Sequence, residues 1–115
     1  MDLEAFQAHC DTMPGAAAGY PFGPEVVVYK VGGKMFAIAA TPPREPRMTL
    51  KCDPEWARVL RDTYPAVIPG YHTNKRHWNT VAWDGTIPDA ELRGMIDHAY
   101  AQVVKGLTKA QRAAL

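Results

Sequence analysis

Apolar residues recur at spacings of three and four in three stretches of the chain, which is the pattern of one buried helix face. The clearest helix start is Asp53-Pro54-Glu55, where an aspartate cap precedes a proline at the first helical position, and Pro65 stops this helix. The predicted helices cover 3–13 with Asp2 as cap, 54–64, a segment from Pro88 to a C-cap at Gly106, and a short turn over 109–115 that Thr108 caps. The second helix is expected to bury Trp56, Val59, Leu60 and Tyr64.

Alternating and β-branched residues predict strands over 26–31, 34–39, 47–52, 66–68 and 77–84. Gly32-Gly33 forms a two-residue hairpin turn, because a type I′ turn needs positive φ at both central positions. This turn places Tyr29 opposite Phe36 and Val27 opposite Ile38. Residues 16–24 are rich in glycine and proline, and we expect them to form a loop.

Two sets of side chains are assigned less directly by the pattern. The aromatics Tyr20 and Phe22 are expected to pack back on the core, and lining a binding surface is the alternative. In the last strand, alternation separates Trp78, Thr80 and Ala82 from His77, Asn79, Val81 and Trp83. Which of these two sets faces the core stays open.

The order of elements, α-β-β-β-α-β-β-α, predicts an α+β fold built as a two-layer sandwich. We expect a five-stranded, mainly antiparallel sheet with the helices on one face and the other face partly open. The 115 residues are expected to form one domain, 1–115, and a monomer. An open sheet face would be a natural binding platform.

Composition narrows the class of protein without naming its activity. The net charge is only +1, so a nucleic-acid surface would require an uneven distribution of cations. Neither a secretory leader nor an apolar run of membrane-spanning length is visible, so we expect a cytoplasmic protein with no membrane partner. Cys10 and Cys52 lack metal-type spacing and are expected to be buried free thiols.

The stretch 67–80 combines two histidines, two adjacent cations, two amides and two large aromatics around a Pro-Gly break. Cations neutralise phosphates and aromatics stack on unpaired bases, so this mixture suits weak nucleic-acid binding. The candidate residues are Lys34, Arg44, Arg47, Lys51, Tyr71, His72, Asn74, Lys75, Arg76, His77 and Trp78.

Three other interpretations of the same stretch remain. Arg76 and His72 suit the carboxylate or phosphate of a small anionic ligand, and the surface also suits a protein partner. Catalysis by Cys52 with a histidine, or a metal held by the two histidines and Asp84, matches no recognised spacing, so neither an enzyme nor a cofactor is expected. Finally, the polar residues of the stretch would simply fix a long turn.

Three segments of the chain resemble the MmcQ/YjbR family of small bacterial proteins. They are Tyr20-Pro21-Phe22-Gly23 with 28–36, Leu50-Lys51-Cys52-Asp53-Pro54, and Val67-Ile68-Pro69-Gly70-Tyr71-His72 continuing to Asp84-Gly85. This resemblance implies a CyaY-like (frataxin-like) α/β sandwich and a DNA-binding protein of unknown biological process. It supplies no catalytic residues. Frataxin-type iron surfaces are acidic, whereas the first helix here offers only Asp2, Glu4 and Asp11.

Overall fold

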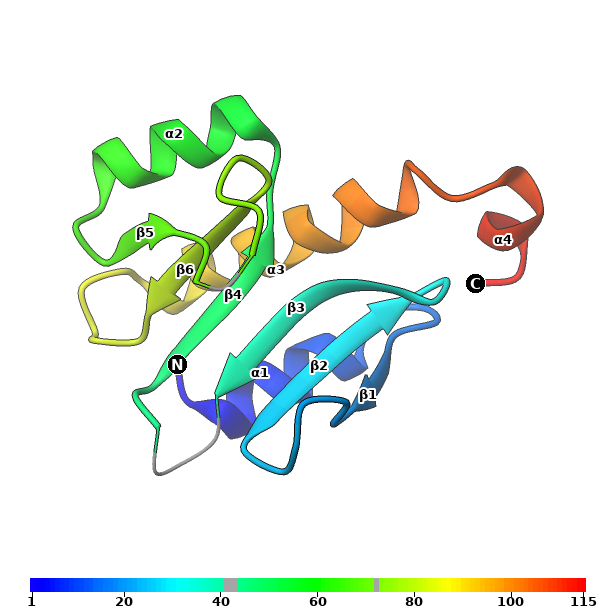
Figure 1. Ribbon diagram of the computed structural model, residues 1–115, viewed down its shortest axis with the longest axis horizontal. Helices are drawn as coiled ribbons and strands as arrows, with labels where there is room; N and C mark the ends of the chain where they lie inside the picture. Colours follow the sequence, from blue (N-terminus) through cyan, green and yellow to red (C-terminus); the bar gives the residue numbers. More distant parts are fainter. Residues whose placement is uncertain (41–43, 72) are drawn as a thin grey trace.

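One sheet and four helices make up the protein in the computed structural model, which describes residues 1–40, 44–71 and 73–115 (Figure 1). The helices are α1 (Leu3–Asp11), α2 (Pro54–Thr63), α3 (Asp89–Val104) and α4 (Lys109–Ala113). The strands are β1 (Ala17–Gly19), β2 (Val26–Val31), β3 (Lys34–Ala40), β4 (Arg47–Lys51), β5 (Val67–Pro69) and β6 (Trp78–Ala82). The α+β class is confirmed.

The sheet has six strands in the order β1-β2-β3-β4-β6-β5, and every neighbouring pair is antiparallel. The prediction of five strands missed β1, which lies inside the segment assigned to a loop. Ala17 and Gly19 pair with Lys30 and Val28 of β2. Small residues and glycine have weak strand propensity, so this strand forms because β2 offers it an unpaired edge.

The β2–β3 hairpin confirms the predicted turn and corrects the predicted register. Gly32 and Gly33 both have positive φ, at 58° and 79°. Beyond the turn, however, a bulge between Tyr29 and Lys30 shifts the pairing by one residue. Tyr29 therefore pairs with Ala37 instead of Phe36, and Val27 pairs with Ala39 instead of Ile38. Because a one-residue shift reverses the faces, Ile38 leaves the core side of the sheet.

The helices cover one face of the sheet and enclose the core. Figure 1 shows α1 and α3 behind the strands, with α2 beside the β5–β6 end. The core residues include Phe6, Tyr29, Phe36, Met48, Leu50, Ile96 and both cysteines, as expected for the cysteines. Phe36 lies between Tyr29 and Tyr100, at ring-centroid distances of 6.3 and 5.5 Å. These contacts fix α3 against β2 and β3.

The predicted helix caps are confirmed for α1, α2 and α4, where the Asp2, Asp53 and Thr108 side chains accept backbone N–H groups. Two expectations for the helices are wrong. The C-cap of α3 is Lys105 and not Gly106. In α2, Ala57 and Leu60 are buried, but Trp56 and Val59 remain 44% and 50% exposed. An apolar strip of α2 therefore stays at the surface.

Among the described residues no helix covers the other face of the sheet, called the open face below, although loops and neighbouring side chains leave Thr49 and Thr80 only 7% and 2% exposed. Paired positions place Ile38, Thr49 and Thr80 in one row across β3, β4 and β6. The open question about the last strand is resolved by these pairs: Trp78, Thr80 and Ala82 lie on the open face. Asn79 and Val81 lie on the helix face, where Asn79 Nδ2 donates to the Ala57 carbonyl of α2 at 3.2 Å.

Candidate functional site

Charge is unevenly distributed between the two layers. The residues that form the six strands include four cations, Lys30, Lys34, Arg47 and Lys51, and no carboxylate. The helices and their caps carry most of the acidic residues. The net charge of the chain is only +1, but its strands are basic. This is the uneven distribution of cations that a nucleic-acid surface would require.

The open face contains a groove of about 410 Å³. Its floor is formed by Ile38 and Thr49, and its rim by Phe22, Arg47 and Tyr71. Phe22 is 65% exposed and Tyr71 is 49% exposed. The expectation that Phe22 and Tyr20 pack on the core is wrong, since Tyr20 is also half exposed. The sequence had offered a binding surface for these aromatics only as the alternative.

Two cation–aromatic pairs lie along β4. The Arg47 guanidinium carbon is 4.5 Å from the centroid of the Tyr71 ring, and Lys51 Nζ is 5.4 Å from the centroid of Trp78. Arg47 and Lys51 share one face of β4 because they are four residues apart in a strand, where side chains alternate. Each pair combines a positive charge with a π surface in one place.

Hydroxyl groups join the two pairs. Thr49 and Thr80 share a hydrogen bond of 2.9 Å between their Oγ1 atoms, and the backbone N–H of Tyr71 donates to Thr80 Oγ1 at 2.9 Å. These contacts hold the start of the β5–β6 turn against the sheet. Tyr71 is therefore positioned beside Arg47 by the backbone, before any ligand binds.

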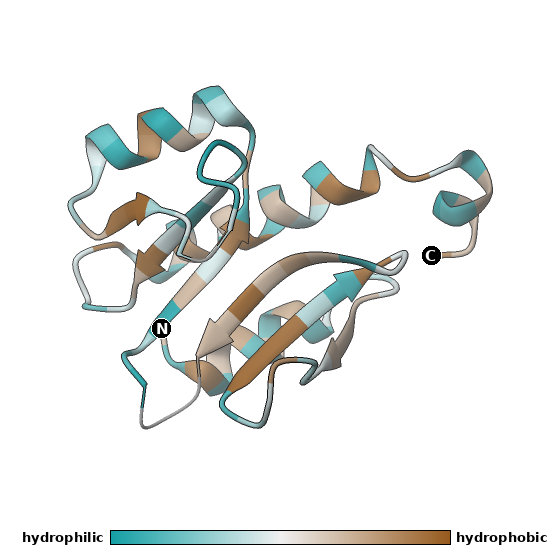
Figure 2. Ribbon diagram, viewed as in Figure 1, coloured by the Kyte–Doolittle hydropathy of each residue, from teal (hydrophilic) through white to brown (hydrophobic). Residues whose placement is uncertain are grey.

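The turn between β5 and β6 organises itself through local polar contacts. Lys75 Nζ donates to the Gly70 carbonyl at 3.0 Å, and the Arg76 backbone N–H donates to Asn74 Oδ1 at 2.9 Å. Arg61 of α2 also donates to the Lys75 carbonyl at 3.1 Å. The interpretation of this stretch as a structural network thus applies to Asn74 and Lys75. Figure 2 shows the turn over 73–77 as hydrophilic, in contrast to the largely hydrophobic β2 and β3 at the other end of the sheet.

The candidate residues are only partly brought together. Arg44, Arg47 and Tyr71 line the groove, while Trp78 and Lys51 lie at the other end of β4. Lys34 lies at the hairpin end of β3, away from the groove at the other end of that strand. Asn74, Lys75, Arg76 and His77 form the turn beside this face. His72 lies outside the described residues.

Carboxylates offset part of the positive charge at the rim. Arg44 Nε contacts Glu25 Oε2 at 3.0 Å, and Arg47 contacts Glu45 at 4.0 Å. Arg44 is therefore already paired, while the longer Arg47–Glu45 contact is exposed to competition by another anion. Phe22 and Thr73 line the same groove and were absent from the candidate set. The positions of these two residues depend on the long-range pairing of β1 and β6, which cannot be predicted from the residues next to them in the sequence.

The Cys52 thiol, which was considered as a nucleophile, is buried in the core. Burial raises the pKa of the Cys52 thiol to about 11, so the reactive thiolate is scarce at neutral pH. Within the described ranges, no group of three or more His, Cys, Asp or Glu side chains could hold a metal ion. In the same part of the chain, no helix is long and apolar enough to cross a membrane.

These features define a two-layer α+β protein with an open basic and aromatic sheet face. The chain belongs to the YjbR family, whose model matches residues 11–102. It is 39% identical over 97 residues to the protein YbdF of Escherichia coli O157:H7, covering 84% of this chain and 80% of that one. It is 32% identical over 112 residues to YjbR of Escherichia coli K12, covering 97% and 95% of the two chains.

Solved structures show the same architecture. The crystal structure of the Deinococcus radiodurans protein DR2400 superposes with a TM-score of 0.91 at 37% identity, over 97% of this chain and 86% of that one. A Pseudomonas syringae protein of 23% identity superposes with a TM-score of 0.76, over 89% and 98% of the two chains, and shares the fold alone. The names of these relatives state no activity, so any function must be argued from the site.

Proposed function

We propose that the protein binds single-stranded nucleic acid weakly on the open face of its sheet. The observation that carries this proposal is the exposed Tyr71 ring held against Arg47 at 4.5 Å, on a sheet whose strands contain cations and no carboxylates. A base stacks on Tyr71 or Phe22, and Arg47 and Lys51 neutralise the adjacent phosphates. Duplex DNA is disfavoured because its bases are not free to stack on these rings.

The expected affinity is modest. Four strand cations, of which Lys34 is remote, contact few phosphates, so the dissociation constant should be on the order of 10–100 µM at low salt. Phosphate contacts position a strand without reading its sequence, and the groove offers few groups for base edges. We therefore expect little sequence preference.

The test is fluorescence anisotropy of a labelled 12-nucleotide DNA at several salt concentrations, with single strand and duplex compared. Arg47→Gln and Tyr71→Leu should each lower the affinity about three- to tenfold, and Arg47→Gln should also reduce the salt slope by about 0.7. Arg93→Gln removes an exposed cation from α3, on the helix side, and should leave binding unchanged. Equal losses in all three variants, or no binding at low salt, would refute the proposal.

A second arm separates the sheet from the turn. In Lys75→Glu/Arg76→Glu, the turn loses both cations while Arg47 and Tyr71 stay in place. If this variant loses binding and Arg47→Gln does not, the nucleic acid lies on the turn and not in the groove. The double variant needs a stability check, because Lys75 Nζ also donates to the Gly70 carbonyl.

A small anionic ligand is a second candidate, because the groove of about 410 Å³ is large enough for one. Arg47 would bind its carboxylate or phosphate while Tyr71 covers an apolar or aromatic part. Chain length distinguishes the two functions. A nucleic-acid surface binds a 12-nucleotide strand much more tightly than a mononucleotide, whereas a small-ligand site binds both with similar affinity.

A further inference from the structure

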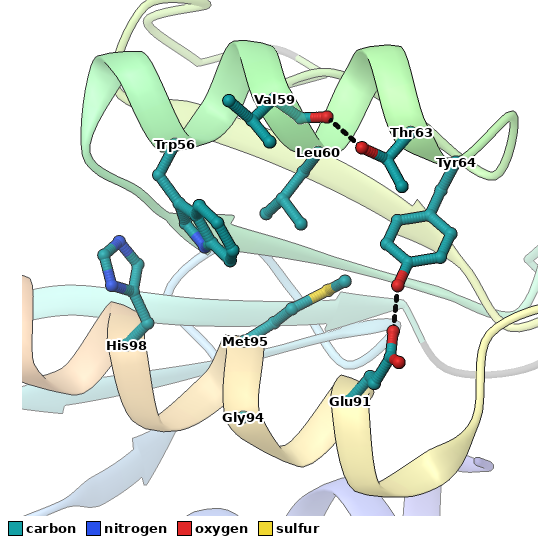
Figure 3. A pocket seen from close by; sticks show the side chains of 9 residues that line it. All are labelled: Trp56, Val59, Leu60, Thr63, Tyr64, Glu91, Gly94, Met95 and His98. Carbon is teal, nitrogen blue, oxygen red and sulfur yellow. Dashed lines mark hydrogen bonds between the residues drawn. The ribbon is translucent and has the colours of Figure 1, made fainter.

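A second groove lies on the helix side of the molecule, between α2 and α3 (Figure 3). Its volume is about 460 Å³, within the range of small-molecule sites. Trp56, Val59 and Leu60 form the α2 wall, and Met95 and His98 of α3 form the other. This groove explains the exposed apolar strip of α2, because Trp56 and Val59 face it instead of the core.

We propose that this groove binds a small organic cation with an apolar body, such as an arylalkylamine. The proposal does not rest on nucleic-acid binding, since the groove and the basic sheet face lie on opposite sides of the sheet. The apolar walls of the groove favour an apolar ligand body. The charge of the lining residues determines whether the polar end of the ligand should be a cation or an anion.

One carboxylate supplies that charge. Among the described lining residues, Glu91 is the one acidic side chain, and no lysine or arginine lines the groove. Glu91 Oε2 accepts a hydrogen bond from the Tyr64 hydroxyl, which fixes the carboxylate at the edge of the groove (Figure 3). An ammonium group placed there gains a charge-assisted hydrogen bond.

The opposite end of the groove stays neutral. His98 Nε2 accepts the backbone N–H of Asp53 at 3.2 Å, so the neutral ring carries its proton on Nδ1. Burial lowers the pKa of His98, which keeps the imidazole uncharged at neutral pH. The lining therefore holds one negative charge and no opposing positive charge.

The Trp56 indole adds an aromatic wall. Its ring lies 6.3 Å from that of His98, tilted by 55°, and remains 44% exposed. Behind Trp56 a recess of about 10 Å³ is too small for more than a single water molecule. The ligand therefore occupies the outer groove, with its apolar body against Trp56, Leu60 and Met95 and its ammonium group at Glu91.

The experiment is a titration with 2-phenylethylamine, followed by ¹H–¹⁵N NMR of the full chain at neutral pH. 2-Phenylethanol and 3-phenylpropionate serve as neutral and anionic probes of similar shape. We expect the amine to bind with a dissociation constant of about 0.1–1 mM, the alcohol at least fivefold more weakly, and the acid not measurably. Shifts should centre on α2 and α3, including the Trp56 indole signal assigned with Trp56→Phe.

Three variants make the titration decisive. Glu91→Gln still accepts from Tyr64 but loses the charge, so it should weaken the amine about five- to tenfold and leave the alcohol unchanged. Glu55→Gln removes an exposed carboxylate of α2 outside the groove and should change neither. Gly94→Leu fills the groove from α3, where an added Cβ meets nothing within 4 Å, and should abolish binding of both probes in a folded protein.

The proposed charge selectivity is wrong if the amine binds no more tightly than the alcohol, or if Glu91→Gln weakens both probes equally. The proposed location is wrong if binding persists in Gly94→Leu, or if the shifted signals lie outside α2 and α3. Absence of binding up to 10 mM amine in the wild-type protein, roughly tenfold above the expected range, counts against the proposal as well.

Discussion

Gly70 shows how a single residue positions the candidate site. Its backbone N–H donates to the Trp78 carbonyl at 2.9 Å, and its carbonyl accepts Lys75 Nζ. A Cβ added at this position would meet the Trp78 Cβ at 2.6 Å and would also collide with the Thr73 hydroxyl. The close approach of the turn to β6 therefore requires glycine here, although its φ is not in the positive range.

We expect Gly70→Ala to lower the free energy of unfolding by about 1–3 kcal/mol, because the turn must move away from Trp78. Urea denaturation measures this change. Gly19→Ala is the matched control, since an added Cβ there meets nothing within 4 Å, and it should cost less than about 0.5 kcal/mol. Equal effects of the two substitutions would mean that the turn tolerates a side chain at Gly70.

At the scale of elements, the helices were predictable and part of the sheet was not. Helix caps such as Asp53 bind backbone N–H groups only two or three residues away, so a short stretch of sequence is enough to predict them. The strand β1 forms on the edge of β2, and the bulge after Tyr29 is a feature of the pairing between β2 and β3. Neither interaction has a local pattern, which is why one strand and one register were missed.

The candidate site was predictable to the same extent. In the predicted strand 47–52, alternation is enough to put Arg47 and Lys51 on one face, and the structure has them on one face of β4. Alternation could not show that Phe22 lines the groove or that Lys34 lies away from it, because both positions follow from the order of the strands. The exposed face of α2 was also missed, since periodicity marks apolar residues but not whether a partner covers them.

One hydrogen bond links two elements in a pH-dependent way. The Asp53 backbone N–H at the start of α2 donates to His98 Nε2 of α3, and burial lowers the pKa of His98 below its ordinary value of about 6.5. The unfolded chain therefore binds a proton at a higher pH than the folded one does. Stability from the neutral ring is present above pH 6.5 and is lost as the pH falls toward the folded pKa.

We expect the wild-type protein to lose more stability than His98→Gln between pH 7 and pH 5, because only the wild type must protonate this ring on unfolding. Urea denaturation at intervals of half a pH unit measures the two curves. Above pH 7 their difference should stay constant. Parallel curves over the whole range would show that His98 does not contribute to acid destabilisation.

The whole molecule separates two kinds of surface by its layers. Three strand cations, Lys30, Arg47 and Lys51, lie on the side where Phe22 and Tyr71 are exposed. The fourth, Lys34, pairs with the core residue Val31 and so lies on the helix side, where the helices carry their carboxylates. The same two-layer core supports both surfaces. A substitution on one surface should therefore affect ligand binding at the other only by changing the stability of the whole fold. Arg47→Gln is thus expected to leave the α2–α3 groove intact.

The two cysteines test whether that core opens as one unit. Burial raises the pKa of Cys10 to about 12 and that of Cys52 to about 11, and both thiols are enclosed among residues of the same core. At pH 8 the small thiolate fraction alone should make each cysteine react with iodoacetamide at least about 100-fold more slowly than a free thiol.

The variants Cys10→Ala and Cys52→Ala each leave a single thiol. We expect the two remaining thiols to be modified at equal rates, because opening of the core limits both reactions. Mass spectrometry across a urea series measures these rates. Faster modification of Cys52 below the unfolding transition would instead mean that α2 detaches while α1 and α3 stay folded.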